Sequence, residues 1–423
     1  MSPNAKVLFA TALFTSLAST QPASAQAAAG QTSAASAAPA PLQAGFQDGF
    51  FIQTADGDYR LLFGFVGQID GRFVVDDPLH AVTDTFTVRK LRPTWSGRIA
   101  RYFDFKVMPD FGNGTAVVQD AYIDVRFSPK FLVRIGKDKT PIGFELLQGD
   151  AFLLFPERSL ASSLVPNRDL GVQVQGDVAG NRLFYAAGVF NGIPDGSSST
   201  TELDTNNAKD LAGRLVFTPW RTTRTAPPTL NGLGFALGGS TGQETGALPG
   251  FKTSVQRTFF SYTGATADGM RRRITPAVFY YYKSFGGFGE YMRSSQWVAK
   301  GSARRYLANT AWEATGSLVL TGEAASDRGV RPKNNFDPAA GHWGALQLLG
   351  RFADLKIDPQ ALDAGFVTTG SSREARSFAV GANWYPNPYI KFYATFERTV
   401  FDRNAAGSHH PENAILFRSQ LAF

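Results

Sequence analysis

The sequence predicts an all-β protein: a transmembrane antiparallel β-barrel of about sixteen strands with a long constriction loop folded inward. Three observations lead there: an N-terminal export pattern, long segments with apolar residues at every second position, and an amphipathic segment that ends on Phe423. Aromatic residues make up 13% of the 423 residues, yet the mean hydropathy is slightly negative. Such a composition is typical of membrane strands that are apolar on one face only, although a large secreted β-sandwich or propeller shares it.

Residues 1–25 have the pattern of a secretory signal peptide. Lys6 precedes an apolar stretch over 7–17, and "ASA" at 23–25 forms an Ala-x-Ala cleavage motif. About a dozen apolar residues cannot cross a bilayer, which needs roughly 20, so the stretch does not suit a membrane anchor. The chain contains no Cys, which excludes disulfides and thiol-based metal sites or nucleophiles.

Residues 26–57 are expected to form a low-complexity leader, and residues 58–423 the barrel. The region that follows the signal is rich in Ala, Ser, Gln and Pro, a composition that buries too little apolar surface to fold. The formal net charge of the whole chain is +7, a modest excess that identifies no class of partner by itself.

Strand patterns follow one another through the body of the chain. In 59–73, Leu61, Phe63 and Phe65 share one parity, whereas Asp70 and Arg72 have the other. Segments of ten residues or more exceed the five or six that are usual in soluble sheets, which favours a barrel wall. The sixteen predicted strands lie within 59–73, 88–99, 102–111, 119–128, 170–178, 181–190, 210–217, 233–240, 257–263, 273–284, 287–296, 309–323, 343–358, 377–386, 389–402 and 415–423.

The last segment, "ILFRSQLAF", is an amphipathic strand that ends on an aromatic residue, and closure of the barrel explains this ending. Unpaired backbone groups cannot face lipid, so a membrane sheet must close on itself. We therefore expect residues 415–423 to form the closing strand, paired with the first.

One predicted connection between strands is unusually long. Residues 140–168 contain apolar side chains such as Phe144, Leu147 and Phe155, so this loop is expected to pack, and in a barrel it can pack inward and narrow the lumen.

An ordered series of motifs resembles the phosphate-selective porin O and P family of outer-membrane channels. The series comprises "VRKLRPTWSG", "FDFKVMPDFG", "QDAYIDVRF", "RIGKDKTPIGFE", "PERS", "VPNRDLGVQV", "GVFNG", "LTGE" and "GANWYP". The resemblance spans nearly the whole body. It implies a sixteen-stranded barrel in the outer membrane of a Gram-negative bacterium, assembled as a homotrimer that contacts outer-membrane lipid and takes up phosphate or related small anions.

The chain departs from the phosphate-specific members of that family at several positions. Those members carry a lysine directly after Gly-x-Glu of the long loop, where this chain has Leu146, and an acid where it has Gln119. Their stretch of alternating arginines corresponds here to a region with only Lys252 and Arg257. The arginines at 271–273 are consecutive, so they point alternately in and out of a strand. These departures argue against strict phosphate specificity.

Basic residues on the polar parity of strands, at the entry to the long loop (Lys137 and Lys139) and within it (Arg158 and Arg168) are the candidates for anion selectivity, because fixed cations favour anions in a narrow passage. The candidates are Lys90, Arg92, Arg98, Lys106, Arg126, Arg134, Lys137, Lys139, Arg158, Arg168 and Arg214. They are accompanied by Asp104, Asp110, Asp120, Asp124 and Glu145. Polar residues line every water-filled barrel, so charge pairing is an equally open role, and Arg158 and Arg168 could simply hold the loop on the wall.

The sequence therefore predicts passive diffusion of small solutes with a preference for anions, phosphate and polyphosphate among them. A non-selective general porin and a plugged structural barrel remain alternatives. Catalysis is disfavoured because His80, His342, His409 and His410 form no catalytic or His-Glu-x-x-His pattern. No cofactor, metal or nucleic-acid partner is expected.

Overall fold

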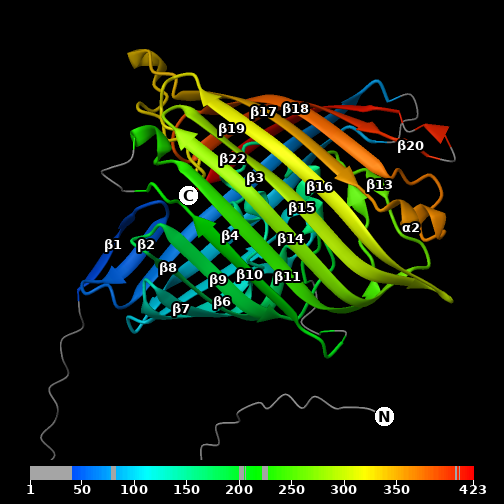
Figure 1. Cartoon of the computed structure of the whole chain (residues 1–423). Helices are drawn as coiled ribbons and strands as arrows, with labels where there is room; N and C mark the ends of the chain where they lie inside the picture. Colours follow the sequence, from blue (N-terminus) through cyan, green and yellow to red (C-terminus); the bar gives the residue numbers. More distant parts are fainter. Residues whose placement is uncertain are drawn as a thin grey trace, which may run out of the picture. The chain divides into compact units, whose positions relative to one another are not determined.

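A closed antiparallel barrel forms most of the chain in the computed structural model, which describes residues 41–77, 82–199, 204, 206–221, 227–404, 407–408 and 410–423. The expected signal peptide, the leader up to residue 40, His80 and His409 lie outside the described residues. The sixteen barrel strands are β3 (Arg60–Val75), β4 (Thr85–Ile99), β5 (Phe103–Asp110), β6 (Val117–Ser128), β7 (Phe131–Lys139), β8 (Arg168–Val178), β9 (Leu183–Phe190), β10 (Asp210–Phe217), β11 (Leu233–Ala247), β14 (Thr266–Tyr282), β15 (Phe285–Lys300), β16 (Ala303–Val319), β17 (Ala345–Lys356), β18 (Glu374–Tyr385), β19 (Ile390–Phe401) and β22 (Glu412–Ala422). Each strand pairs with its neighbour along the chain, and the long tilted strands are visible in Figure 1.

The closing strand is confirmed. β22 pairs with β3 in antiparallel register, with Ile415 opposite Phe73. The last residue continues this pairing: the Phe423 N–H donates to the Phe65 carbonyl at 3.0 Å and the Phe65 N–H donates to the Phe423 carbonyl at 2.8 Å. Its ring also lies 5.7 Å from that of Phe50 and 5.9 Å from that of Phe65. The terminal aromatic residue therefore completes both the backbone pairing and an aromatic cluster.

A hairpin lies within the range assigned to the leader, so the predicted leader is not unstructured throughout. β1 (Leu42–Phe46) pairs with β2 (Phe50–Thr54), and β2 pairs with the first residues of β3, where Phe50 lies opposite Phe63. The reason is packing: the ring of Phe46 contacts Phe423 and Tyr389, a surface that exists only after the barrel has closed.

Two strand assignments differ from the expectation, although the total of sixteen is confirmed. β7 was not predicted, because its end at Lys137–Lys139 is a charged run that resembles a loop. The predicted strand at 257–263 lies instead in the connection between β11 and β14, which carries the small pair β12 (Phe251–Lys252) and β13 (Thr258–Phe260). There the rings of Phe259 and Phe260 are buried in the apolar core rather than in the barrel wall.

The two faces of the wall differ in chemistry as alternation predicts. On β3, Leu61 and Ile69 are exposed on the outer face, whereas Gln68 and Asp70 are buried on the inner face. Among the described residues, no helix is long and apolar enough to cross a membrane. The helical elements are α1 (Phe144–Leu147), α2 (Pro359–Asp363), η1 (Gly112–Gly114), η2 (Leu160–Leu164), η3 (Pro228–Leu230) and η4 (Pro338–Ala340), while β20 (Arg403–Asn404) and β21 (Gly407–Ser408) form a second small pair.

Candidate functional site

The connection between β7 and β8, residues 140–167, is packed against the inner face of the wall. It begins with α1, whose first N–H groups are capped by Glu290 of β15: the carboxylate accepts from the Phe144 N–H at 2.5 Å and from the Glu145 N–H at 3.1 Å. The carboxylate of Glu145 accepts in turn from the Ser159 N–H and the Ser162 hydroxyl, both at 2.8 Å. This polar framework folds the segment on itself and provides an acceptor for the first N–H groups of α1.

Side chains from strands around the closing seam donate to backbone carbonyls in the middle of this connection. These bonds run from Gln68 of β3 to Asp150 at 3.2 Å, from Gln420 of β22 to Ala151 at 3.0 Å, from Lys391 of β19 to Leu153 at 2.7 Å, from Asn383 of β18 to Leu154 at 2.9 Å and from Arg351 of β17 to Glu157 at 2.9 Å. The donors have the buried parity of their strands. The connection therefore extends from β7 and β8 to the inner faces of β17–β19, β22 and β3, and these five backbone carbonyls have donors from the wall.

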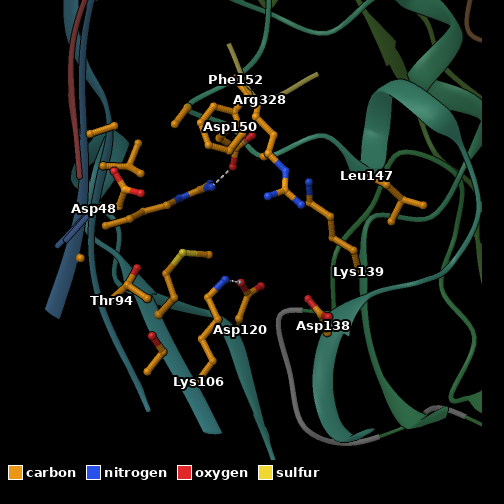
Figure 2. A pocket seen from close by; sticks show the side chains of 18 of the residues that line it. Asp48, Thr94, Lys106, Asp120, Asp138, Lys139, Leu147, Asp150, Phe152 and Arg328 are labelled. Atoms are coloured by element: carbon orange, nitrogen blue, oxygen red, sulfur yellow. Dashed lines mark hydrogen bonds and ion pairs between the residues drawn. The ribbon is translucent and has the colours of Figure 1, made fainter. Parts of the chain in front are cut away.

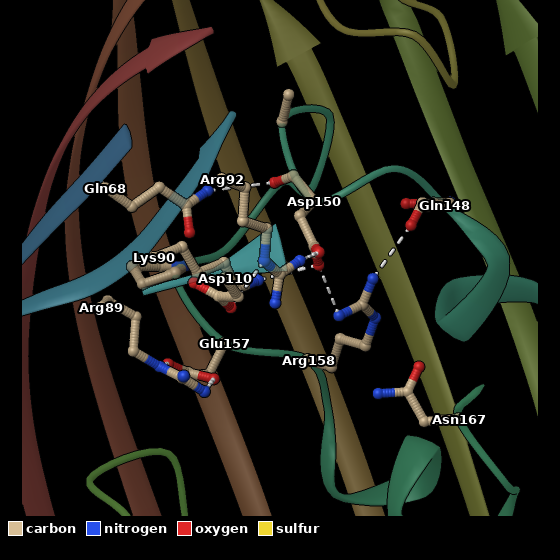
Figure 3. A network of polar contacts seen from close by, with 12 residues as sticks. Gln68, Arg89, Lys90, Arg92, Asp110, Gln148, Asp150, Glu157, Arg158 and Asn167 are labelled. Carbon is tan, nitrogen blue, oxygen red and sulfur yellow. Dashed lines mark hydrogen bonds and ion pairs between the residues drawn. The ribbon is translucent and has the colours of Figure 1, made fainter. Parts of the chain in front are cut away.

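Two acids of the connection anchor it through ion pairs with the wall (Figure 3). Asp150 pairs with Lys90 at 2.8 Å and with Arg92, both on β4, and with Arg158 at 2.8 Å. Glu157 pairs with three arginines of the wall. They are Arg89 at 2.6 Å, Arg72 at 3.1 Å and Arg418 at 3.4 Å.

The surroundings of these two acids favour their charged form. Burial opposes ionisation of Glu157, but the charges of Arg89 and Arg418 outweigh it and hold its pKa below the usual range of a glutamate. Burial likewise opposes ionisation of Asp150, and the charges of Lys90 and Arg158 outweigh it, so that its pKa also lies well below the ordinary value. Both carboxylates are therefore charged at neutral pH.

A cavity of about 880 Å³ lies on one side of the connection (Figure 2). It is bounded by strands β3 to β10, the end of β22, the connection itself, the β1–β2 hairpin and the 320–344 connection between β16 and β17. Its eight basic residues are Arg92, Lys106, Arg134, Lys139, Arg168, Arg214, Arg328 and Arg331. Its four acidic residues are Asp48, Asp120, Asp138 and Asp150. We call it the larger cavity; basic side chains outnumber acidic ones there.

A second cavity of about 510 Å³, the smaller cavity, lies toward the β11–β14 connection. Its basic residues are Arg89, Lys90, Arg92, Arg158, Arg168 and Lys252, and its acidic ones are Asp110, Asp150, Glu157, Asp195 and Glu397. The two cavities have Arg92, Asp150 and Arg168 in common. These three side chains border both cavities, and we call them the junction.

The structure gathers most of the predicted selectivity residues around these cavities. Lys90, Arg92, Lys106, Arg134, Lys139, Arg158, Arg168 and Arg214 line one or both of them, whereas Arg98, Arg126 and Lys137 line neither. Arg98 and Arg126 both pair with Asp104 near the turn between β4 and β5, and Lys137 donates to the Ser199 carbonyl.

Nearly all of the cavity-lining candidates are bound to protein groups. Lys106 and Arg168 share Asp120, at 2.7 and 2.6 Å. Arg134 pairs with Asp124 and Asp138, and the Lys139 ammonium donates to the carbonyls of Leu146 and Gln148. Arg158 pairs with Asp150 within the connection, and Arg168 pairs with Asp120 of β6.

Arg214 differs from these residues. Within the described part of the chain, it has no carboxylate at ion-pair distance, and its guanidinium lies 5.9 Å from the centre of the Phe144 ring. Its charge is therefore compensated less directly than that of the other basic residues around the larger cavity.

Several basic residues of the ion-pair network and the cavities are not among the candidates predicted from the sequence. Arg72, Arg351 and Arg418 occupy polar-parity positions in strands, so their parity could have identified them. Arg328 and Arg331 lie in the 320–344 connection, where no periodic signal marks them. Arg331 pairs with Asp48 of the β1–β2 hairpin at 2.6 Å.

Phosphate-specific family members carry a lysine at the position of Leu146, which makes apolar contacts in this chain. Leu146 is buried in a cluster with Ile142, Leu160 and Leu164. Gln119 lines the smaller cavity. No group of three or more metal-binding side chains occurs within the described residues.

Solved structures share the fold of this chain at low sequence identity. The outer-membrane channel DcaP of Acinetobacter baumannii matches with a TM-score of 0.55 and 11% identity over 88% of this chain and 99% of that chain. An anion-selective porin from Comamonas acidovorans matches with a TM-score of 0.53 and 12% identity over 86% and 99%. OmpT of Vibrio cholerae, in its trimer form, matches with a TM-score of 0.52 and 11% identity over 86% and 99%. A comparison with curated proteins gives no match.

A match to a family model goes further than these likenesses of fold. The model of "Phosphate-selective porin O and P" matches residues 66–423, which is the barrel from within β3 onward. The chain therefore belongs to the phosphate-selective porin O and P family.

Proposed function

We propose that this outer-membrane porin lets small solutes diffuse passively and prefers anions, phosphate and polyphosphate among them. The observation that carries the preference is the charge of the larger cavity, where eight basic side chains face four acidic ones. A water-filled passage with excess fixed cations attracts anions and repels cations of similar size.

Arg214 is the residue to which we assign the largest single contribution. An arginine without a carboxylate partner keeps its guanidinium donors available for a passing oxyanion, whereas a paired arginine must first exchange its partner. Arg328 adds positive charge at the same cavity from the 320–344 connection. These two residues would guide anions toward the junction, where Arg92 and Arg168 line the path.

The pairing pattern also supports a modest rather than strict selectivity. At the junction, Asp150 offsets Arg92, and Asp120 offsets Arg168. A non-selective general porin is therefore the second candidate function. The position equivalent to the family lysine is a buried leucine, which favours a general anion passage over a dedicated phosphate site.

The reversal potential of single channels in a KCl gradient tests the proposal. We expect anion selectivity in the wild type and a clear shift toward cations in Arg214→Glu. The matched control is Arg182→Glu, the same charge change in an exposed turn that lines neither cavity; it should behave as wild type. Equal permeabilities for K⁺ and Cl⁻ in the wild type would favour the general porin, and no conductance at all would favour a plugged structural barrel.

Phosphate added to the same bilayer then tests the solute. Partial block of the chloride current by millimolar phosphate would support binding of the oxyanion within the passage. Anion selectivity without any block would restrict the function to small anions in general.

We also propose that the porin assembles as a homotrimer in outer-membrane lipid. Family membership supports this, as does a trimer among the proteins of similar fold. The mass of the detergent-solubilised native protein, measured by light scattering, tests it: a mass of one chain would contradict the trimer.

A further inference from the structure

The outer, membrane-facing side of β10, β11, β14 and β15 contains an open hollow of about 1140 Å³. The strand register explains it. Gly213 of β10 lies opposite Gly239 of β11, and Gly239 lies opposite Ile274 of β14. The neighbours Leu211 and Leu215 of Gly213 are exposed, so both glycines have the outward parity. Two adjacent outward positions without side chains leave the hollow.

The side of the hollow toward the β14–β15 turn is apolar. Leu215 lies opposite Leu237, and both are about half exposed, at 49% each. Leu237 lies opposite Pro276, which continues the row onto β14. Such a surface suits acyl chains, as expected for a barrel wall in a bilayer.

The opposite side of the hollow carries two arginines on the outer face. Ile274 lies opposite Arg293, and Arg272 lies between Thr241 and Ser295 in the adjacent row. Both arginines are exposed and line the hollow. Within the described residues, Arg272 has no hydrogen bond or ion pair, and Arg293 donates only to the Ser295 hydroxyl at 3.3 Å.

Arg272 and Arg293 differ from the other arginines nearby, and this difference points to a ligand. Arg271 and Arg273 point inward from the same strand and pair with Asp210. On the outer face near the same end of the barrel, Arg304 pairs with Asp268 at 2.8 Å, and Arg376 pairs with Glu374. Arg272 and Arg293 thus face the membrane as adjacent cations without an acid. A cation on the lipid face of a barrel is unfavourable unless an anion compensates it.

We propose that this hollow binds a phosphorylated glycolipid of the outer leaflet, with a phosphate between Arg272 and Arg293 and an acyl chain along Leu215 and Leu237. Arginine forks bind phosphate through charge-assisted hydrogen bonds. Arg272 is six residues from the start of β14, which follows the long β11–β14 connection, and long connections of such barrels face the cell exterior. The arginines are therefore near the headgroups of the outer leaflet.

A second copy of the chain is a poorer occupant. Among the described residues, the outward acids Asp268 and Glu374 already have arginine partners. A copy related by a two-fold axis would present the same face and bring arginines against arginines. The lipid supplies both the phosphate and the acyl chain that the two sides of the hollow require.

Binding of diphosphoryl lipid A to the purified full-length porin in detergent, measured by native mass spectrometry, tests the proposal. We expect Arg272→Ala combined with Arg293→Ala to weaken binding by at least about tenfold, because two charge-assisted contacts are lost. Arg376→Ala is the matched control, an outward arginine with an internal partner, and should bind as the wild type does. Dephosphorylated lipid A should bind weakly to all three proteins.

Each other outcome overturns the proposal. Equal affinity in the wild type and the double variant, or equal affinity for the dephosphorylated lipid, would show that no phosphate is held at these arginines. Loss of the oligomer in the double variant with unchanged lipid affinity would identify the hollow as a subunit interface. Heat-modifiable gel migration confirms folding of each variant. The reversal potential should not change, so this proposal can fail while the proposed function stands.

Discussion

The larger and smaller cavities lie on either side of the β7–β8 connection and differ in charge balance. The smaller cavity has six basic and five acidic residues, because the acids of the connection and the wall nearly match its arginines and lysines. The larger cavity has eight basic residues and four acids, and part of its excess comes from Arg328 and Arg331 in a connection at the barrel's rim. The ion-pair network that holds the connection is therefore close to neutral, and charge selectivity should arise on the side of the larger cavity.

Removal of Arg418 should have the largest effect, because it disrupts the ion-pair network that holds the β7–β8 connection. Arg418 is buried and forms two bonds to Asp70, at 2.6 and 2.8 Å, besides its pair with Glu157. Arg418→Ala would leave the buried Asp70 carboxylate with only its 3.3 Å pair to Arg72, and we expect a loss of about 3–5 kcal/mol in the free energy of unfolding. Urea unfolding followed by the gel-mobility shift measures it. A loosened connection should also raise single-channel conductance, because the two cavities would then join more widely.

The control for this variant is Arg376→Ala, in which the arginine is exposed and the expected loss is within about 0.5 kcal/mol. Wild-type stability and conductance in Arg418→Ala would show that the connection is held mainly by its backbone carbonyl contacts.

Neutralising Asp150 at the junction should increase the excess of positive charge there. Asp150→Asn keeps the size of the side chain but removes the charge that offsets Lys90, Arg92 and Arg158. We expect the Cl⁻/K⁺ permeability ratio to rise roughly twofold or more, because the narrow path would carry uncompensated cations. Reversal potentials provide the measurement. Asp104→Asn, whose partners Arg98 and Arg126 line neither cavity, should change nothing; an equal rise in both variants would mean that the junction is not the selective point.

Charge reversal in the two cavities should have unequal effects. Arg328→Glu in the larger cavity should lower the permeability ratio by about twofold, a modest effect because the residue is exposed and screened. Lys252→Glu in the smaller cavity should lower it less. The same measurement in a KCl gradient compares them, and a larger effect of Lys252→Glu would reverse our assignment of selectivity to the larger cavity.

Lowering the pH is expected to have the smallest effect. The pKa values of Asp150 and Glu157 are depressed, since the charges of nearby basic residues outweigh burial. A carboxyl with a depressed folded pKa contributes stability above its unfolded pKa and loses it only as the pH falls through the folded value. Conductance and the unfolding midpoint should therefore change little between pH 7 and about pH 4. A sharp transition near the ordinary pKa of a carboxyl would contradict the strong pairing of these acids.

Local patterns predicted the strands well and the irregular segments poorly. Alternation over 59–73 correctly separated Leu61 from Asp70, because parity follows from backbone geometry alone. It missed β7, whose charged end resembles a loop, and it placed a strand at 257–263, where two phenylalanines pack into the core. The β1–β2 hairpin was also missed, because its rings pack on Phe423 and Tyr389 only in the closed barrel.

The sequence by itself determined the barrel, its closing strand and several of the basic residues with inward parity, since these depend on periods of two residues and on the need to pair every edge. It could not determine which of those residues keep an available charge. Arg418 and Asp70 are 348 residues apart and meet only because β22 pairs with β3. Whether a charge is compensated depends on distances in space, so only the tertiary structure showed that, within the described part of the chain, Arg168 has an acidic partner and Arg214 does not. It also showed that the inward Arg273 pairs with acids, whereas the outward Arg272 has no acidic partner among the described residues.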